Sequence, residues 1–363
     1  MFRVALTRLA AAAILFFSLG AFRALGADAK PKAYALLISG ESGEPQFAEN
    51  YADWVTRLHK ILAKQGGLPA ENICVLMENK QAAPQICSDT SRKENVLRSL
   101  KQLKEKVVPG DQVLIVLIGH ATLQDKIQKF CLPGPDITVD EFTEAVNQIQ
   151  TREIIVVAAH QFSCNLLERL SVPGRVLITA TSEPVEGNET YFMEFFVQAY
   201  EKQPAARKDQ PNLLEIFNSA ALDCAKWYLR QYMIYDGHNH PTHIWRVEGK
   251  QAFALWKKFY GKLPYFEINE SASSTTVDDA EPAVGDWGPQ WFGRRILAEH
   301  AQLDDLGDKT GASVFVDNEF TPLKGENDAG KLAKQTCLGQ PNGNRELPKL
   351  PAKAPPVKEA EKK

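Results

Sequence analysis

The chain has 363 residues, of which 44% are hydrophobic and 24% are charged, and its formal net charge is −3. This balance is typical of a globular protein with ample apolar material for a core. The near-neutral charge gives no sign of nucleic-acid binding, and no acidic block indicates a halophilic protein or a solvating tail.

The first 26 residues have the pattern of a secretory signal peptide. Arg3 and Arg8 precede an apolar run over 9–22, which is followed by Ala24-Leu25-Gly26. A short basic region, an apolar centre and a small-x-small site are the three parts of such a signal. An uncleaved anchor would need a longer apolar run, and a mitochondrial presequence would be amphipathic and rich in Arg. We expect cleavage near Gly26, a secreted or periplasmic protein, and no membrane span after cleavage.

Strands and helices alternate over the expected main domain, residues 27–231. Short runs rich in β-branched residues predict buried strands, and apolar residues at helical spacing predict the helices. The expected strands are 33–39, 72–77, 113–118, 153–159 and 174–180, and the expected helices are 47–65, 95–107, 138–150, 166–170, 189–200 and 213–230. Two of the helices follow capping boxes, Ser91-x-x-Glu94 and Thr138-x-x-Glu141. This alternation predicts a mainly parallel sheet with helices on both faces.

The pattern breaks down over 232–293, which is rich in aromatic residues and His, and we interpret this region as an insertion or accessory lobe. Residues 294–345 are expected to complete the main domain, with a short helix over 294–308 that runs into an acidic turn. The tail over 346–363 is dominated by Pro, Lys, Ala and Glu and is predicted to be disordered.

Potentially reactive side chains follow two of the expected central strands. His120 comes after the run 113–118 and Gly119, while His160 and Cys164 follow the run 153–159. Ligands of open α/β sheets bind beyond the carboxyl ends of the strands. Cys164 and His120 are therefore candidates for a nucleophile and its base, with His160 as an alternative base. The alternatives are a polar cap for His120 and a buried structural thiol for Cys164.

This order of motifs resembles the caspase–legumain clan of cysteine peptidases, and within it the legumain-like branch, peptidase family C13. The matching pieces are Ile118-Gly119-His120, the strand that ends near 160–164, and the strand over 175–181. The chain is also similar to exported bacterial relatives of that branch in its segments 129–136 (KFCLPGPD) and 299–308. The resemblance covers roughly residues 33–230 and 294–310. It implies a caspase-like three-layer sandwich with five or six strands.

The resemblance also implies where the catalytic groups belong. In the clan a Gly follows the His, and the nucleophile lies in Ala-Cys-x-Ser-Gly. Here Ala121 follows the His, Gln161 occupies the nucleophile position and Cys164 occupies the position of the final Gly. A cysteine peptidase would use Cys164 as nucleophile, His120 to move the proton, and the backbone N–H groups of Ala121 and Cys164 as the oxyanion hole.

A second interpretation is a non-catalytic module that binds a peptide or an envelope protein in the same cleft. The presence of Gln161 favours it, because a carboxamide cannot attack a peptide carbonyl. In both interpretations the partner is a peptide or protein, and no cofactor is expected.

Two clusters of possible metal ligands lie outside these motifs. His238, His240 and His243 could bind zinc or copper, which would make the chain a metal-binding envelope protein. Asp304, Asp305 and Asp308 offer oxygen ligands like those of a calcium-binding turn. The alternatives are a solvated loop for the His cluster and an acidic turn that caps a helix for the Asp cluster.

Six cysteines in an exported chain permit three disulfides, whose pairing the sequence does not determine. Cys74 and Cys87 are close enough in sequence to form one pair. Cys131 and Cys164 could form another pair beyond the strand ends, and in that disulfide Cys164 would have no free thiol to act as a nucleophile.

Overall fold

The structure is a computed structural model that describes residues 30–124, 127–182, 189–204, 207–229, 231–235, 241–246, 299–316, 319–326, 329–342 and 345–347. The expected signal peptide, most of 232–293 and nearly all of the tail lie outside these residues. The described residues from Lys32 onward belong to one compact unit. In this part of the chain, no helix has both the length and the apolar character that a membrane span requires.

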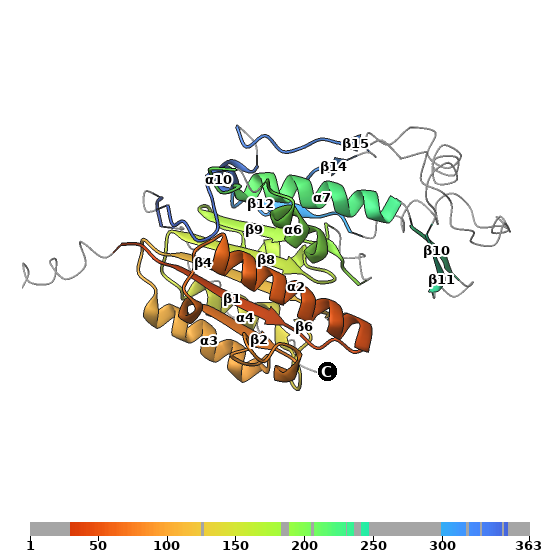
Figure 1. The fold of residues 1–363 in the computed structure, drawn as a ribbon, viewed down its shortest axis with the longest axis horizontal. Helices are drawn as coiled ribbons and strands as arrows, with labels where there is room; N and C mark the ends of the chain where they lie inside the picture. Colours follow the sequence, from red (N-terminus) through yellow and green to blue (C-terminus); the bar gives the residue numbers. More distant parts are fainter. Residues whose placement is uncertain are drawn as a thin grey trace, which may run out of the picture. The chain divides into compact units, whose positions relative to one another are not determined.

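The main sheet has eight strands in the order β13-β12-β9-β8-β4-β1-β2-β3 (Figure 1). Its strands are β1 (Ala33–Ser39), β2 (Ile73–Met77), β3 (Asp89–Thr90), β4 (Gln112–Ile118), β8 (Glu153–Ala159), β9 (Arg175–Thr179), β12 (Gln302–Asp304) and β13 (Ala312–Ser313). The six strands from β3 to β9 are parallel, and at one edge β12 pairs antiparallel with β9 and β13 pairs antiparallel with β12. The predicted mainly parallel sheet is confirmed, with more strands than the five or six expected.

Every residue of the central strands β1, β4 and β8 is buried. These strands are near-continuous runs of aliphatic residues, as is typical of parallel strands covered on both faces. Their register places Ser39, Ile118 and Ala159 side by side at the carboxyl end of the sheet. The segments that follow these three strands therefore leave the sheet at neighbouring points.

Helices cover both faces of the sheet and make a three-layer α/β sandwich (Figure 1). Helices α2 (Pro45–Lys64), α6 (Phe192–Glu201) and α7 (Leu213–Leu229) pack on one face, and α3 (Lys93–Lys106), α4 (Val139–Asn147) and α5 (Asn165–Leu170) pack on the other. Along β4, Leu114, Val116 and Ile118 face the first layer, while the alternate residues face the second. The smaller elements are β5 (Ala121–Gln124), β6 (Ile127–Phe130), β7 (Ile137–Thr138), β10 (Gln231–Tyr235), β11 (Pro241–Arg246), β14 (Phe315–Val316), β15 (Glu319–Phe320) and α10 (Lys331–Lys334).

The helix predicted over 294–308 is wrong where the structure describes the chain. Residues Gln302–Asp304 form strand β12, which pairs antiparallel with β9. Leu303 is fully buried in the core beside Ile178. The edge of β9 supplies hydrogen-bond partners that the local sequence cannot reveal, so tertiary pairing overrides the local preference.

One of the two predicted capping boxes is confirmed. Thr138 and Glu141 bond each other's backbone N–H groups at the start of α4, as the motif requires. The box predicted at Ser91 is wrong, because α3 has Arg92 as its N-cap. The backbone N–H of Ser91 is instead bonded to Met77 O at the end of β2, and its buried hydroxyl has no hydrogen-bond partner among the described residues.

Two expected features fall in regions described only in part. Strands β10 and β11 form an antiparallel hairpin within the segment interpreted as an insertion. The remainder of 236–298 lies outside the described residues, as does the tail beyond 347.

Candidate functional site

His120 leaves the carboxyl end of β4 and lies against the segment that follows β1. Gly119 makes this approach possible, because a Cβ there would come within 3.2 Å of the backbone of Gly40. The imidazole Nε2 is 2.8 Å from the carbonyl oxygen of Ser42. Since a carbonyl only accepts hydrogen bonds, Nε2 carries the hydrogen and donates it. The rings of Phe47 and Tyr51 pack edge-on against the imidazole, with centroids 5.3 and 5.9 Å away.

The second ring nitrogen of His120 faces a carboxylate. Nδ1 is 2.7 Å from Oε2 of Glu189, and the other oxygen of Glu189 accepts a hydrogen bond of 2.6 Å from the hydroxyl of Tyr51. Burial lowers the pKa of His120, but the hydrogen bond and the charge of Glu189 outweigh that effect and raise the pKa above its ordinary value. The geometry therefore favours an imidazolium that donates from both nitrogens, and an imidazolium cannot accept a proton from a nucleophile.

Gln161 completes this network at the end of β8. Its carbonyl oxygen accepts a hydrogen bond of 2.9 Å from the N–H of Ala121, the predicted oxyanion donor. Its amide nitrogen is 3.2 Å from Oε2 of Glu189 and 3.0 Å from Nδ1 of His120. With Nδ1–H directed at Glu189, the Gln161 amide donates to the same carboxylate. The carboxamide therefore occupies the space between the His and the oxyanion donor.

A strained turn holds Gln161 in this place. Phe162 has φ +57°, a left-handed conformation that costs a residue with a Cβ about 1–2 kcal/mol. Buried hydrogen bonds to Thr181, after β9, stabilise the turn: the N–H of Thr181 donates to Ser163 Oγ at 3.1 Å, and the N–H of Cys164 donates to Thr181 Oγ1 at 3.2 Å. The strain is thus offset by contacts from a neighbouring strand end.

Cys164 is placed differently from a catalytic thiol. It is the N-cap residue of α5, is 9% exposed, and has its sulfur 3.9 Å from Asn165 Oδ1. Its backbone N–H, the second predicted oxyanion donor, is bonded to Thr181. The structure places the Gln161 carboxamide against His120, and the catalytic pair of Cys164 and His120 stays a prediction.

His160, the alternative base, is enclosed in the protein. It is 1% exposed and packs against Phe130 with ring centroids 5.2 Å apart. Nδ1 donates to the carbonyl oxygen of Gln161 at 2.8 Å, and the buried Nε2 has no hydrogen-bond partner in the described part of the chain. Burial lowers the pKa of His160 to about 4, so the ring is neutral at physiological pH and out of reach of a ligand.

The predicted disulfides do not form in the structure. Cys74, Cys87, Cys131 and Cys337 are free thiols, which excludes both the Cys74–Cys87 bond and the Cys131–Cys164 bond. Cys131 lies beside the site, because its N–H donates to the carbonyl oxygen of His120 at 2.9 Å. Burial, with the charges of Asp136 and Glu41, raises the pKa of the Cys131 thiol to about 11. This thiol therefore stays protonated at neutral pH and is a poor nucleophile.

The three aspartates of the predicted ion-binding turn bind protein groups instead. Asp304 accepts hydrogen bonds from the N–H groups of the turn that follows it and from the hydroxyl of Ser171. Asp305 accepts from three N–H groups at the start of α10, and Asp308 accepts from the N–H and hydroxyl of Thr310. No group of metal-ligating side chains is clustered among the described residues. Asp305 caps α10, as the helix-capping alternative predicts, whereas Asp304 and Asp308 stabilise the turn itself, and the predicted ion site there is not supported.

The predicted His cluster is not placed. His238 and His240 lie outside the described residues, and only the backbone of His243, in β11, is described. A metal site there stays a prediction.

Three groups of the network were missed by the sequence argument: Glu189, Tyr51 and the carbonyl of Ser42. No motif marks them. Tyr51 belongs to the buried face of α2, and Glu189 lies three residues before the start of α6, so each has a simpler local role as a packing residue or as part of a loop before a helix. Only the packing of α2 and α6 on the same face of the sheet brings them to His120.

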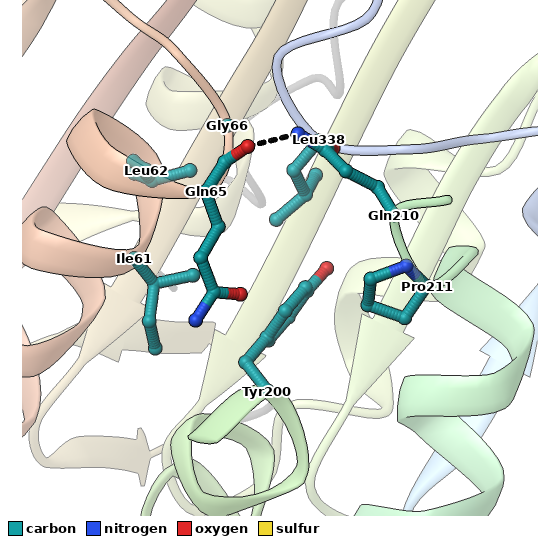
Figure 2. A pocket seen from close by; sticks show the side chains of 8 residues that line it. All are labelled: Ile61, Leu62, Gln65, Gly66, Tyr200, Gln210, Pro211 and Leu338. Atoms are coloured by element: carbon teal, nitrogen blue, oxygen red, sulfur yellow. Dashed lines mark hydrogen bonds between the residues drawn. The ribbon is translucent and has the colours of Figure 1, made fainter. Parts of the chain in front are cut away.

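Two hollows in the described surface lie away from His120. The smaller one has room for about one water-sized molecule and lies between α2 and α6 (Figure 2). There the Gln210 amide bonds the carbonyl of Gln65, while the buried hydroxyl of Tyr200 has no hydrogen-bond partner among the described residues. The wider hollow is lined by Pro173, Gly174, Leu332, Gln335, Asn342, Arg345, Glu346 and Leu347. Neither hollow contains a predicted site residue.

Comparisons with known proteins do not identify a family for this chain. No protein-family model and no curated protein sequence matches the chain. Among solved structures, the chain is similar to protein GSU0716 from Geobacter sulfurreducens, with a TM-score of 0.37 and 11% identity over 60% of this chain and 94% of that one.

Proposed function

We propose that this protein is an exported, non-catalytic peptide-binding module, related to the legumain-like cysteine peptidases and using the strand-end site around His120 to hold a peptide or protein. The observation that carries the proposal is the position of the Gln161 carboxamide. Its carbonyl oxygen accepts a hydrogen bond from the N–H of Ala121 and its amide nitrogen lies 3.0 Å from Nδ1 of His120, so the carboxamide fills the space between the two groups that a peptidase would use.

Acyl transfer by a thiol needs a base with a free lone pair and an open oxyanion donor. Both nitrogens of His120 are engaged, Nε2 by a carbonyl and Nδ1 by the carboxylate of Glu189. Burial lowers the pKa of His120, but the hydrogen bond and charge of Glu189 raise it above its ordinary value, so the protonated form, which has no lone pair, persists to a higher pH than in a free imidazole. These features argue against the peptidase interpretation with Cys164 as nucleophile.

The same features suit binding. The side chains of His120 and Glu189 are 24% and 12% exposed, so the network reaches the surface at the carboxyl end of the sheet, where ligands of such folds bind. Side chains held by several hydrogen bonds are preorganised, and preorganisation reduces the entropy lost on binding. A rigid polar site of this kind supports recognition without turnover.

Alkylation of the native, unreduced mature protein with iodoacetamide, mapped by mass spectrometry, tests the absence of catalysis. We expect Cys164 to react no faster than an ordinary thiol and at the same rate in a His120→Ala variant. Cys131 serves as an internal reference, because its labelling should rise steeply only as the pH approaches 11. Rapid labelling of Cys164 that slows in His120→Ala would reveal an activated thiolate and overturn the proposal.

Export forms a separate part of the proposal and rests on the N-terminal pattern. N-terminal sequencing of the protein from fractionated cells should find a chain that starts just after Gly26, in the periplasm or the medium. A chain that keeps its first residues in the cytoplasmic fraction would contradict this part alone.

A further inference from the structure

Strand β5 begins directly after His120 and forms one edge of the small sheet β5-β6-β7. Its hydrogen bonds alternate in direction, as in any antiparallel pair. The carbonyl of His120 bonds Cys131 on the β6 side, so the N–H and C=O groups of Ala121 and Leu123 point away from β6. The N–H of Ala121 confirms this direction, because it meets the side chain of Gln161. The outward groups of Leu123 thus lie on the same edge as the His120 site, two residues further along.

This edge is open to solvent. Thr122, Leu123 and Gln124 are exposed, and no described strand other than β6 pairs with β5. Leu123 and Ile127, on the two strands of this hairpin, are among the few large apolar side chains exposed in the described residues. Proteins usually protect an edge strand by keeping it short or with Pro, a charged side chain or a bulge, and of these devices β5, Ala121–Gln124, has only its short length. An unprotected edge beside a polar site is suited to the addition of another strand.

Two acidic side chains lie near His120, where this edge begins, since the charges of Glu189 and Glu44 both act on its imidazole. Two more, Asp136 and Glu41, act on Cys131, which bonds His120 on the β6 side. A protonated His120 offsets one of the two carboxylates that act on it. The remaining negative charge favours a cationic group on the ligand.

We propose that an extended peptide adds as a strand to the free edge of β5 and directs a Lys or Arg side chain toward the carboxylates around His120. Backbone hydrogen bonds to Leu123 would provide sequence-independent affinity, and Glu44 and Glu189 would select the basic residue. This inference rests on the proposed binding function and names its ligand class and mode of recognition.

The test uses the full mature chain and a positional-scanning library of acetylated hexapeptides, with binding measured by fluorescence anisotropy. Peptides with Lys or Arg at one position should bind best, and Glu44→Gln should reduce that preference. Leu123→Pro removes the outward N–H without breaking a bond to β6, so it should weaken binding by about tenfold, as expected for loss of one hydrogen bond. The matched control Leu123→Ala keeps the N–H and should bind within about threefold of the wild type.

Hydrogen exchange of the Leu123 amide in the wild type provides a second measurement that needs no variant. Bound peptide should slow this exchange, while an unchanged rate at saturating peptide would overturn strand addition. Peptide binding that is unaffected by Leu123→Pro but lost in Glu189→Gln would be consistent with the proposed binding function and would refute strand addition to β5. Preference for acidic peptides would refute the ligand class, and a library without any binder would overturn both proposals.

Discussion

The ion pair between His120 and Glu189 should stabilise the fold in a pH-dependent way. The two side chains are 24% and 12% exposed and their charged atoms are 2.7 Å apart, so the pair is much better shielded than a surface salt bridge. Hydrogen bonds to charged groups contribute about 1.5–3 kcal/mol, against about 0–1 kcal/mol for exposed pairs. We therefore expect a double-mutant cycle of His120→Gln and Glu189→Gln to give a coupling free energy of about 2 kcal/mol at pH 6.

The sign of the pH dependence follows from the raised pKa of His120. A group whose pKa is higher in the folded protein contributes fully below its unfolded pKa of about 6.5, and the contribution is lost as the pH rises through the folded value. The coupling should therefore fall between pH 6 and pH 9.5. Urea unfolding followed by Trp fluorescence at both values measures it.

The exposed pair Lys101–Glu105 is a matched control. Its atoms are 3.9 Å apart and its side chains are 74% and 62% exposed, so the same kind of cycle should give no more than about 0.5 kcal/mol. A His120–Glu189 coupling at pH 6 that is no larger than this control would refute the reasoning. A coupling that stays constant up to pH 9.5 would show that His120 does not titrate in this range and would contradict the predicted pH dependence.

Two further predictions concern stability. Because burial lowers the pKa of His160 to about 4, the free energy of unfolding should fall by up to about 3 kcal/mol as the pH falls from 6.5 toward 4. His160→Leu should remove most of that loss, while His59→Gln, at a half-exposed helix position, should leave it in place. Equal pH profiles for wild type and His160→Leu in urea titrations would count against an enclosed neutral imidazole. Thr138→Ala should destabilise the protein by about 1 kcal/mol, because it removes a formed capping box. Ser91→Ala removes a buried hydroxyl that has no hydrogen-bond partner among the described residues, so it should be neutral or stabilising. Thermal unfolding that ranks the two variants the other way would contradict the assignment of the helix starts.

Much of the layered fold could be predicted because its signals are local. The runs that became β1, β4 and β8 are aliphatic over their full length, and such runs between turn residues are typical of strands covered on both faces. The helices between them have apolar residues at helical spacing. The position of His120 at the carboxyl edge followed from the same patterns, since it comes directly after a central strand.

Other features depended on contacts between distant segments. Strand β12 forms because the edge of β9 offers hydrogen-bond partners, and it lies in the stretch 294–308 that was expected to be helical. The start of α3 moved because Ser91 is held by the end of β2. In both cases a hydrogen bond from a remote strand outweighed a preference of well under a few kcal/mol that the local sequence could express.

The sequence by itself determined that an imidazole, a carboxamide and a thiol would gather near two strand ends, and it raised the question of catalysis. Only the tertiary structure decided which groups meet. Glu189 lies against His120 and is bonded by Tyr51, both from segments packed against one face of the sheet, and the Gln161 side chain turns toward the imidazole. The protonation of His120 depends on these neighbours and on burial, which arise from packing across more than a hundred residues of chain. Short stretches of sequence determine which residues follow a strand and where the strand ends, whereas the charge partners and directions of side chains depend on how distant segments pack in the folded molecule.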